Sequence, residues 1–189
     1  MFRLTQSDNS GLTQEEIVAV VSLVNRVWPH PEKTVDELVR GFTGAYERYF
    51  APYVLSRPPI RFMAWKEGRL AGHAFTFERP MHIGGVETPV MALAQVCVDP
   101  ACRGNGLGAR LARCAFQRLQ SDQFPLSIFQ TTVPVFYERL GARIVENQFI
   151  NSRNPNDPGA RPWKDGVIMI YPQDFMWPHG SIDLNGPGY

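Results

Sequence analysis

The chain has 189 residues, 44% of them hydrophobic, so it can bury one sizeable core but is too short for two large domains. Its 19 Lys and Arg residues and 18 Asp and Glu residues leave a formal net charge of +1, which argues against a nucleic-acid-binding protein. No apolar run approaches the roughly 18 residues of a membrane-spanning helix, and no apolar stretch of signal-peptide length begins the sequence, so we expect a cytoplasmic protein without a membrane partner.

Two capping boxes predict helices in the first fifty residues. Thr13 and Glu16 form the first box, and the predicted helix runs to about Val27, where Pro29 ends it. A second box, at residues 34–37, opens a shorter predicted helix through Leu38 and Val39. Aromatic residues follow at helical spacing, and they either fill the core or wall a pocket; they are Phe42, Tyr46, Tyr49, Phe50 and Tyr53.

The next stretch is rich in β-branched and aromatic residues with turn signals, which predicts strands. Strands at residues 60–65 and 70–77 form a hairpin around a turn at Gly68, and a Gly-Gly turn leads to a strand over residues 86–98. We therefore expect an antiparallel meander of three sequential strands, ended by Pro100. Five further elements are predicted: an amphipathic helix over 107–119, a strand over 126–130, a short helix over 135–140, and strands over 144–150 and 166–171, the last after a loop at 151–162.

Cysteine and histidine spacing gives no sign of a metal site or of disulfides. Cys97, Cys102 and Cys114 are an odd number of thiols without paired C-x-x-C spacing, and the four histidines are scattered. We expect reduced, mostly buried thiols and no metal.

A glycine-rich turn lies between the predicted strand 86–98 and the predicted helix after it, and it reads Arg103-Gly104-Asn105-Gly106-Leu107-Gly108-Ala109. Glycine permits positive φ and lets backbone N–H groups approach a ligand, and a new helix N-terminus offers unpaired donors. The turn predicts a cradle for an anion such as a pyrophosphate. It also satisfies the loose dinucleotide pattern G-x-G-x-x-A, but the antiparallel meander before it and the lack of an acidic ribose ligand about 20 residues later argue against that alternative.

The turn resembles the signature of the GNAT acyltransferase superfamily, with Val96, Val98 and Pro100 in family-like positions before it. The resemblance implies an α+β fold with three α/β/α layers, in which a mixed, mostly antiparallel sheet has splayed central strands flanked by helices. It also implies acetyl-CoA as cosubstrate. In such a site, Val96, Cys97 and Val98 would hold the pantetheine, and Arg103, Gly104, Asn105, Gly106, Leu107, Gly108 and Ala109 would hold the pyrophosphate.

A second segment, Pro134-Val135-Phe136-Tyr137-Glu138-Arg139-Leu140-Gly141-Ala142, is similar to the family's F-Y-x-x-L-G-F element. The resemblance gives Tyr137 the role of protonating the departing thiolate, unless its ring merely packs. A phenol pKa near 10 against a thiol pKa of about 8.5 makes that transfer modestly uphill. Five titratable residues on or beside the meander leave the general base open: His73, Glu78, His82, Glu87 and Asp99.

The C-terminal part, residues 151–189, adds to a core over residues 1–150 within one acyltransferase domain spanning residues 1–189. Its segment from Trp177 to Pro187 is similar to the ends of two GNAT branches, the nodulation acyltransferases A and the aminoglycoside 2′-N-acetyltransferases, which acylate amino sugars. The resemblance places Trp177, Asp183 and Tyr189 at an acceptor pocket; the alternative is a tail that covers a sheet edge. The balanced charge disfavours a polycationic acceptor.

The sequence therefore predicts an acetyl-CoA-dependent N-acetyltransferase that acylates a primary amine of a small molecule, such as an amino sugar, by direct attack on the thioester. A non-catalytic acyl-CoA-binding regulatory module stays open as an alternative, and a dinucleotide-binding oxidoreductase is the third. The sequence does not fix the amine, the acyl chain length or the choice between a monomer and a homodimer.

Overall fold

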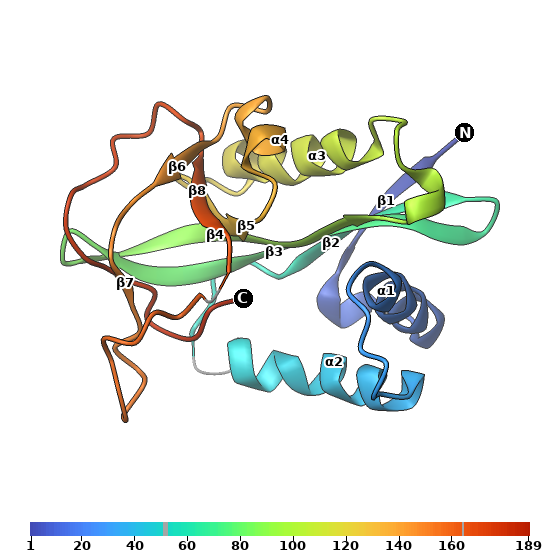
Figure 1. The fold of residues 1–189 in the computed structure, drawn as a ribbon, viewed down its shortest axis with the longest axis horizontal. Coiled ribbons are helices and arrows are strands. Elements are labelled where there is room, and N and C mark those ends of the chain that lie inside the picture. Colours follow the sequence, from blue (N-terminus) through green and yellow to red (C-terminus); the bar gives the residue numbers. More distant parts are fainter. Residues whose placement is uncertain (51–52, 164) are drawn as a thin grey trace. The chain divides into compact units, whose positions relative to one another are not determined.

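The computed structural model describes residues 1–50, 53–163 and 165–189, apart from the side chains of residues 45–49. The expectation for the rings of Tyr46 and Tyr49 therefore lies outside the described residues. The chain forms two compact units, a first unit of residues 1–76 and 95–115 and a second unit of residues 77–94 and 116–189. Three elements pass through both units (Figure 1): β3 (Arg69–Ile83), β4 (Val86–Val98) and α3 (Leu107–Ser121).

The strands of the first unit form an antiparallel ladder. β1 (Arg3–Asp8) pairs with β2 (Ile60–Lys66), and β2 pairs with the first part of β3, which confirms the predicted hairpin. A bulge between Ala64 and Trp65 shifts the register. Strand β1 was not predicted, because its sequence RLTQSD is largely polar and half-exposed; hydrogen bonds to β2, rather than apolar alternation, make it a strand.

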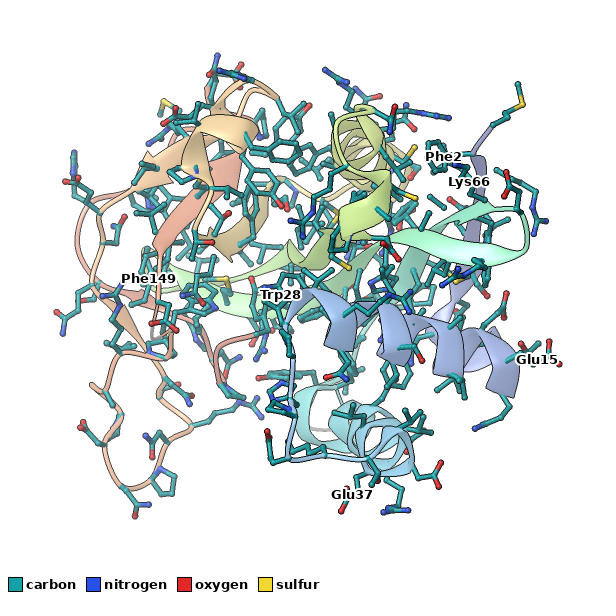
Figure 2. The ribbon with its side chains drawn as sticks, turned by 45° about the vertical axis from the view of Figure 1, so that its right-hand side comes forward. Phe2, Glu15, Trp28, Glu37, Lys66 and Phe149 are labelled. Carbon is teal, nitrogen blue, oxygen red and sulfur yellow. The ribbon has the colours of Figure 1, made fainter. Side chains whose placement is uncertain are left out.

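Two helices, α1 (Gln14–Val27) and α2 (Val35–Tyr49), belong to the first unit (Figure 1). The first capping box is confirmed, since the Glu16 N–H donates to Thr13 Oγ1 at 3.2 Å and the Thr13 N–H donates to Glu16 Oε2 at 3.0 Å. Figure 2 labels both ends of α1, at Glu15 and Trp28. Helix α2 is longer than predicted, because it continues through Gly41 and Gly44 despite their low helix propensity.

The first unit has a core between α1 and the strands. Val20 and Leu23 of α1, Met63 of β2, Leu70 of β3 and Cys97 of β4 are buried together. The first turns of α3 approach β3 at Gly72, where an added Cβ would lie 2.7 Å from Leu111 and 3.2 Å from Leu107. Gly72 is therefore required for close packing of helix against strand.

The second unit contains a mixed sheet in the order β3-β4-β5-β8-β6, with β5 (Ser127–Thr131), β8 (Val167–Tyr171) and β6 (Arg143–Val145). β4 and β5 are parallel and register at Met91↔Ser127 and Ala92↔Ile128, whereas β8 is antiparallel to both β5 and β6. The predicted strand 144–150 is wrong in detail. It is two strands, β6 and β7 (Phe149–Ile150), and β7 pairs in parallel with β9 (Ile182–Asp183).

Both faces of the second unit's sheet carry apolar side chains. On one face, Ile128, Ile168 and Ile170 cluster with the rings of Phe149 and Trp163. On the other, Phe116 of α3 stacks on Tyr171 of β8 with ring centroids 3.8 Å apart, and α4 (Pro134–Glu138) contributes Tyr137.

Among the described residues, no helix combines the length and the apolar character that crossing a membrane requires.

Candidate functional site

The glycine turn of the first unit is an open, ordered loop between β4 and α3. A short 3₁₀ turn (Pro100–Cys102) follows β4, and α3 begins at Leu107. Gly104 has φ +81° and Gly106 has φ +67°, and a Cβ added at either would meet no heavy atom within 4 Å. Residues 103–106 are exposed. The space beside the turn and the unpaired N–H groups at the start of α3 fit a bound diphosphate.

Side chains within the loop fix its shape without occupying that space. Asn105 Nδ2 donates to the backbone carbonyls of Cys102 and Arg103 at 3.3 and 3.1 Å, and Arg103 Nε donates to the Val98 carbonyl at 3.3 Å. Asp99 accepts a hydrogen bond from the Ala101 N–H and forms a 3.2 Å ion pair with Arg26 of α1. These contacts account for Asp99, one of the five candidate bases, as an anchor of the turn.

The end of β4 carries the three residues expected to bind the pantetheine. Val96 and Val98 are half-buried, and they follow Gln95, a non-glycine residue with φ +53°. The Cys97 side chain is only 4% exposed, and burial raises the pKa of its thiol to about 12. The thiol is therefore protonated at neutral pH, which removes it as a covalent nucleophile and leaves its backbone as the part available to a ligand.

Tyr137 lies in the second unit, in the short helix α4, as predicted. Its ring is buried, with centroids 4.5 Å from Phe129 and 4.8 Å from Phe136. The following chain turns tightly, because the N–H groups of Leu140 and Ala142 both donate to the Tyr137 carbonyl. The orientation of the ring is thus held by packing on β5 and by the geometry of the turn.

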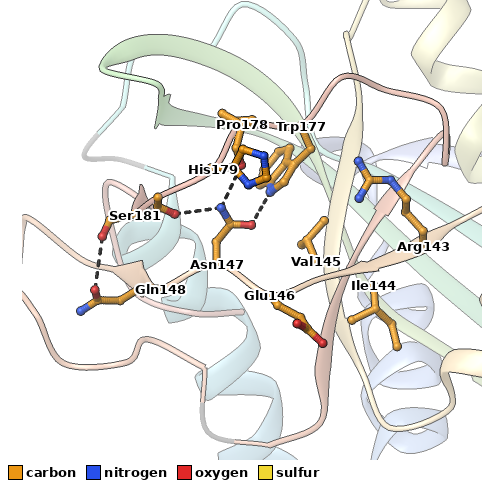
Figure 3. A pocket seen from close by; sticks show the side chains of 11 residues that line it. Arg143, Ile144, Val145, Glu146, Asn147, Gln148, Trp177, Pro178, His179 and Ser181 are labelled. Carbon is orange, nitrogen blue, oxygen red and sulfur yellow. Dashed lines mark hydrogen bonds between the residues drawn. The ribbon is translucent and has the colours of Figure 1, made fainter.

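Trp177 lines a polar groove of the second unit with a volume of about 660 Å³ (Figure 3). Asn147 organises this groove: its Oδ1 accepts a hydrogen bond from Trp177 Nε1 at 2.5 Å, and its Nδ2 donates to the carbonyls of Pro178 and Gly180 at 3.0 and 2.8 Å. Sequence reasoning missed Asn147, since a lone Asn between two strands carries no signal. The remaining lining residues are Arg143, Ile144, Val145, Glu146, Gln148, His179 and Ser181.

Asp183 does not line this groove. It belongs to β9, where its Oδ1 accepts hydrogen bonds from the backbone N–H groups of Ser152 and Asn185 and its Oδ2 lies 3.2 Å from His82 Nδ1. Burial raises the pKa of Asp183, but the hydrogen bonds from Ser152, Asn185 and His82 outweigh burial and lower it overall. The carboxylate is therefore ionised, and it ties the loop after β7 to the tail.

Tyr189 is packed inside the second unit. Its hydroxyl donates to the Ile128 carbonyl at 2.9 Å, and its ring meets Phe77 and Trp163 edge-on at 5.0 and 5.3 Å. Burial raises the pKa of its phenol, opposed by the charge of Arg79. The structure thus gives Trp177 a groove and gives Asp183 and Tyr189 partners within the protein, and it does not gather the three side chains around one cavity.

The remaining candidate bases and thiols carry no metal centre. In the part of the chain that the structure describes, no group of three or more His, Cys, Asp or Glu side chains could hold a metal ion. His82 faces Asp183 and, at 3.9 Å, Glu87, whereas His73 is fully buried in the first unit.

Comparisons with known proteins agree on one family. Residues 10–145 match the family described as an acetyltransferase (GNAT) domain. Nodulation protein A of Azorhizobium caulinodans is 28% identical over 166 residues, which cover 79% of this chain and 73% of that protein.

Two solved structures illustrate the fold. An acyl-CoA N-acyltransferase from Pseudomonas aeruginosa has a TM-score of 0.59 at 18% identity and covers 90% of this chain and 99% of its own. Glucosamine-6-phosphate N-acetyltransferase from Arabidopsis thaliana has a TM-score of 0.56 at 16% identity and covers 77% of this chain and 94% of its own. These likenesses confirm the predicted fold. The antiparallel pairing of β2 with β3 before the turn also leaves the dinucleotide-binding alternative without support, because that alternative requires a parallel unit.

Proposed function

Because this chain belongs to the GNAT family of acetyltransferases, we propose that it acetylates the primary amine of a small amino sugar by direct attack of the amine on acetyl-CoA. At the level of the family, the expectations of an N-acetyltransferase and of acetyl-CoA as its cosubstrate are confirmed. What we propose beyond the family is the class of amine and the work of individual residues.

The observation that carries the proposal is the open glycine turn. Two glycines with left-handed backbone, Gly104 and Gly106, leave the turn free of side-chain atoms on the side where N–H groups are available. A diphosphate is the ligand best matched to this arrangement, because its charge complements the positive end of α3 and its oxygens accept several N–H bonds at once. We assign residues 103–109 to the diphosphate and the backbone of residues 96–98 to the pantetheine.

Acetyl-CoA supplies an acyl group on a sulfur leaving group when it is bound. The chain supplies a proton donor, for which we propose Tyr137: its phenol would protonate the departing sulfur as the neutral amine nitrogen bonds to the carbonyl carbon and the carbon–sulfur bond breaks. The acylated nitrogen then gives up its extra proton, which returns to the Tyr137 phenolate directly or through water and so restores the phenol. The protonated state of Cys97 supports direct attack, since no other residue of the proposed pantetheine strand offers a thiol or hydroxyl nucleophile. In a direct attack there is no acyl-enzyme intermediate, so the only leaving group that Tyr137 has to protonate is the sulfur of CoA.

For the acceptor we propose an amino sugar bound at the groove of Trp177. A partly exposed indole beside hydrogen-bonding side chains suits a pyranose ring, which offers an apolar face and equatorial hydroxyls. The name of one solved neighbour, a glucosamine-6-phosphate N-acetyltransferase, supports this class, and so does the resemblance of the segment from Trp177 to Pro187 to the ends of acyltransferases that act on amino sugars. We propose that Asp183 and Tyr189 serve the acceptor indirectly, by holding the segment that carries Trp177.

The test is the release of CoA thiol from acetyl-CoA in the presence of a panel of amines. The panel contains glucosamine, glucosamine 6-phosphate, a polycationic aminoglycoside and a linear alkylamine of similar amine pKa. We expect the highest kcat/KM with a mono-amino sugar. Equal or higher kcat/KM with the linear amine would contradict the sugar proposal, and thiol release with none of the amines would favour a module that binds acyl-CoA without turnover.

A matched pair of variants ties the acceptor to the groove. Both variants lose the hydrogen bond to Asn147, but Trp177→Leu removes the aromatic face, whereas Trp177→Phe keeps a smaller aromatic face. We expect Trp177→Leu to raise the KM for the amino sugar by more than Trp177→Phe does, with the KM for acetyl-CoA unchanged in both. Equal KM values for the sugar in wild type and Trp177→Leu would place the acceptor elsewhere.

A further inference from the structure

A polar cluster in the first unit, built around two buried side chains, joins three neighbouring strands. It consists of Arg61 on β2, His73 on β3 and Gln95 on β4, and we call it the Arg61–His73–Gln95 cluster. Arg61 Nη1 lies 3.1 Å from His73 Nε2 and donates to Gln95 Oε1 at 3.3 Å, and His73 Nδ1 lies 3.3 Å from the Gln95 carbonyl oxygen. Arg61 is 5% exposed and His73 is 0% exposed, so water competes little for the bond between them, whereas Gln95 lies at the exposed edge of the cluster.

The donors and acceptors of the cluster can be assigned in only one way. A guanidinium donates and never accepts, so His73 Nε2 must be the acceptor of the Arg61 bond. The proton of the neutral imidazole is then on Nδ1, which donates to the Gln95 carbonyl. Burial, the nearby Arg61 charge and the opposing bond to Gln95 together hold the pKa of His73 well below its usual value, so this neutral tautomer persists at neutral pH.

The guanidinium of Arg61 is enclosed on all sides. Its Cζ lies 4.3 Å from the ring centroid of Phe42 on α2 and 3.8 Å from that of Phe75 on β3, and its Nε donates to Asn9 Oδ1 at 2.6 Å. Burial lowers the pKa of Arg61 to about 9, so it stays charged at neutral pH. None of its contacts among the described residues is a carboxylate. Apolar side chains would fill this space without the desolvation of a cation, so packing alone does not explain the arrangement.

The cluster converges on one backbone position. Gln95 has φ +53°, a left-handed conformation that a non-glycine residue adopts only when its surroundings hold it there. Here Arg61 holds the side chain of Gln95 and His73 holds its carbonyl. The next three residues, 96–98, are those whose backbone we assign to the pantetheine. The direction in which their amides point therefore depends on the conformation at Gln95.

We propose that Arg61 and His73 are positioning residues for acetyl-CoA binding: together they lock Gln95 in its left-handed conformation and so set the orientation of the amides of residues 96–98. The inference rests on the proposed function, because it assumes that this part of β4 contacts the cosubstrate. It assigns no chemical step to Arg61 or His73.

The test measures acetyl-CoA Kd by calorimetry in the full chain with Gln95→Met and Arg61→Lys, singly and together. Gln95 is exposed, so Gln95→Met removes the Oε1 acceptor with little risk to folding. Arg61→Lys keeps the charge but loses the fork that reaches three acceptors, on Asn9, His73 and Gln95. We expect each single variant to raise Kd roughly 3- to 10-fold, and the double variant to raise it by less than the product, since both remove the same bond.

A control variant separates positioning from general loss of stability. Leu23→Ala empties part of the same core without touching the cluster, and we expect it to lower the Tm at least as much as Arg61→Lys while its Kd stays within about twofold of wild type. A Kd within about twofold of wild type for both Gln95→Met and Arg61→Lys overturns the inference. So does an equal rise in Kd for Leu23→Ala. If Arg61→Lys does not fold, Gln95→Met decides alone.

The two proposals fail in different ways. If Gly106→Val also binds acetyl-CoA normally, the turn does not hold the cosubstrate and both proposals are wrong. If Gly106→Val abolishes binding while Gln95→Met and Arg61→Lys bind as wild type does, the turn is assigned correctly and only the positioning role is wrong.

Discussion

Replacing Gly106 with Val is the sharpest test of the proposed diphosphate site. The added side chain would stand in the open space beside the turn, where no protein atom lies within 4 Å of a Cβ. It would therefore compete with a ligand rather than with the protein. We expect Gly106→Val to fold and to lose most of its stabilisation by acetyl-CoA.

The magnitudes separate the two effects of this substitution. A left-handed backbone at φ +67° costs a non-glycine residue about 1–2 kcal/mol, which lowers the Tm of a chain of this length by roughly 2–8 °C without ligand. Acetyl-CoA at about 100 times its Kd stabilises the wild type by about 2.7 kcal/mol, or roughly 5–11 °C. If Kd rises about 100-fold in the variant, the same concentration contributes about 0.4 kcal/mol, or roughly 1 °C.

The assay is a thermal melt with and without acetyl-CoA, and Gly68→Val is its matched control. Gly68 lies in the β2–β3 turn with φ +77° and likewise has no atom within 4 Å of a Cβ, so it carries the same backbone cost. We expect Gly68→Val to melt lower than wild type but to keep the full ligand shift. A full shift in Gly106→Val would refute the assignment of the diphosphate to this turn.

Three further predictions follow from the second unit and from His73. Tyr137→Phe should lower kcat roughly 10- to 1000-fold with acetyl-CoA Kd nearly unchanged, and a normal kcat would leave Tyr137 as a packing residue. Removal of residues 186–189 should lower kcat/KM for the acceptor and also lower the Tm. The reason is that the Pro187 carbonyl accepts a hydrogen bond from buried Arg79 and the Tyr189 hydroxyl donates one to the Ile128 carbonyl. A loss of acetyl-CoA binding in the folded truncated chain would contradict this prediction. Because the pKa of His73 is lowered on folding, the unfolded state takes up its proton first, so stability should fall as pH drops below about 6.5, by up to about 1.4 kcal/mol per pH unit. Urea titrations should show a shallower fall in His73→Gln, and identical slopes would refute this.

Local chemistry explains which elements could be predicted from the sequence. The reciprocal bonds of Thr13 and Glu16 involve residues three apart, so the sequence alone reveals the start of α1. Strand β1 depends on a partner more than fifty residues away, as the pair Asp8↔Ile60 illustrates. The prediction of one strand over residues 144–150 was wrong because it, too, depends on residues distant in the sequence. The side chain of Asn147 donates hydrogen bonds to carbonyls in the segment at 178–180, and the strand is interrupted there.

The same distinction applies to the proposed diphosphate turn and, separately, to the proposed acceptor groove. The proposed diphosphate turn can be recognised in the sequence because we assign the binding to backbone N–H groups, and the glycines in a seven-residue stretch mark where the backbone carries no side chain. The groove of Trp177 joins residues 143–148 with residues 177–181, and no local pattern connects them. The Arg61–His73–Gln95 cluster draws on three strands. His73 was a candidate base because it lies on the predicted meander; its side chain is fully buried and bonded to Arg61 and Gln95, and we therefore propose a positioning role for it instead.

The course of the chain also suggests why the proposed binding of the cosubstrate and the proposed binding of the acceptor can change independently of each other. The first unit contains all the residues that we assign to the CoA part of the cosubstrate, from Gln95 to residue 109. Tyr137 and Trp177 belong to the second unit. We propose that backbone atoms bind CoA, and such a site tolerates changes in most side chains provided the glycines and the conformation at Gln95 are kept. The proposed acceptor groove is lined by β6 and by irregular segments at residues 146–148 and 177–181, and side chains on the irregular segments can be exchanged without disturbing a strand register. A change of acceptor therefore requires substitutions at positions such as Glu146 and His179, and these should leave acetyl-CoA Kd unaltered.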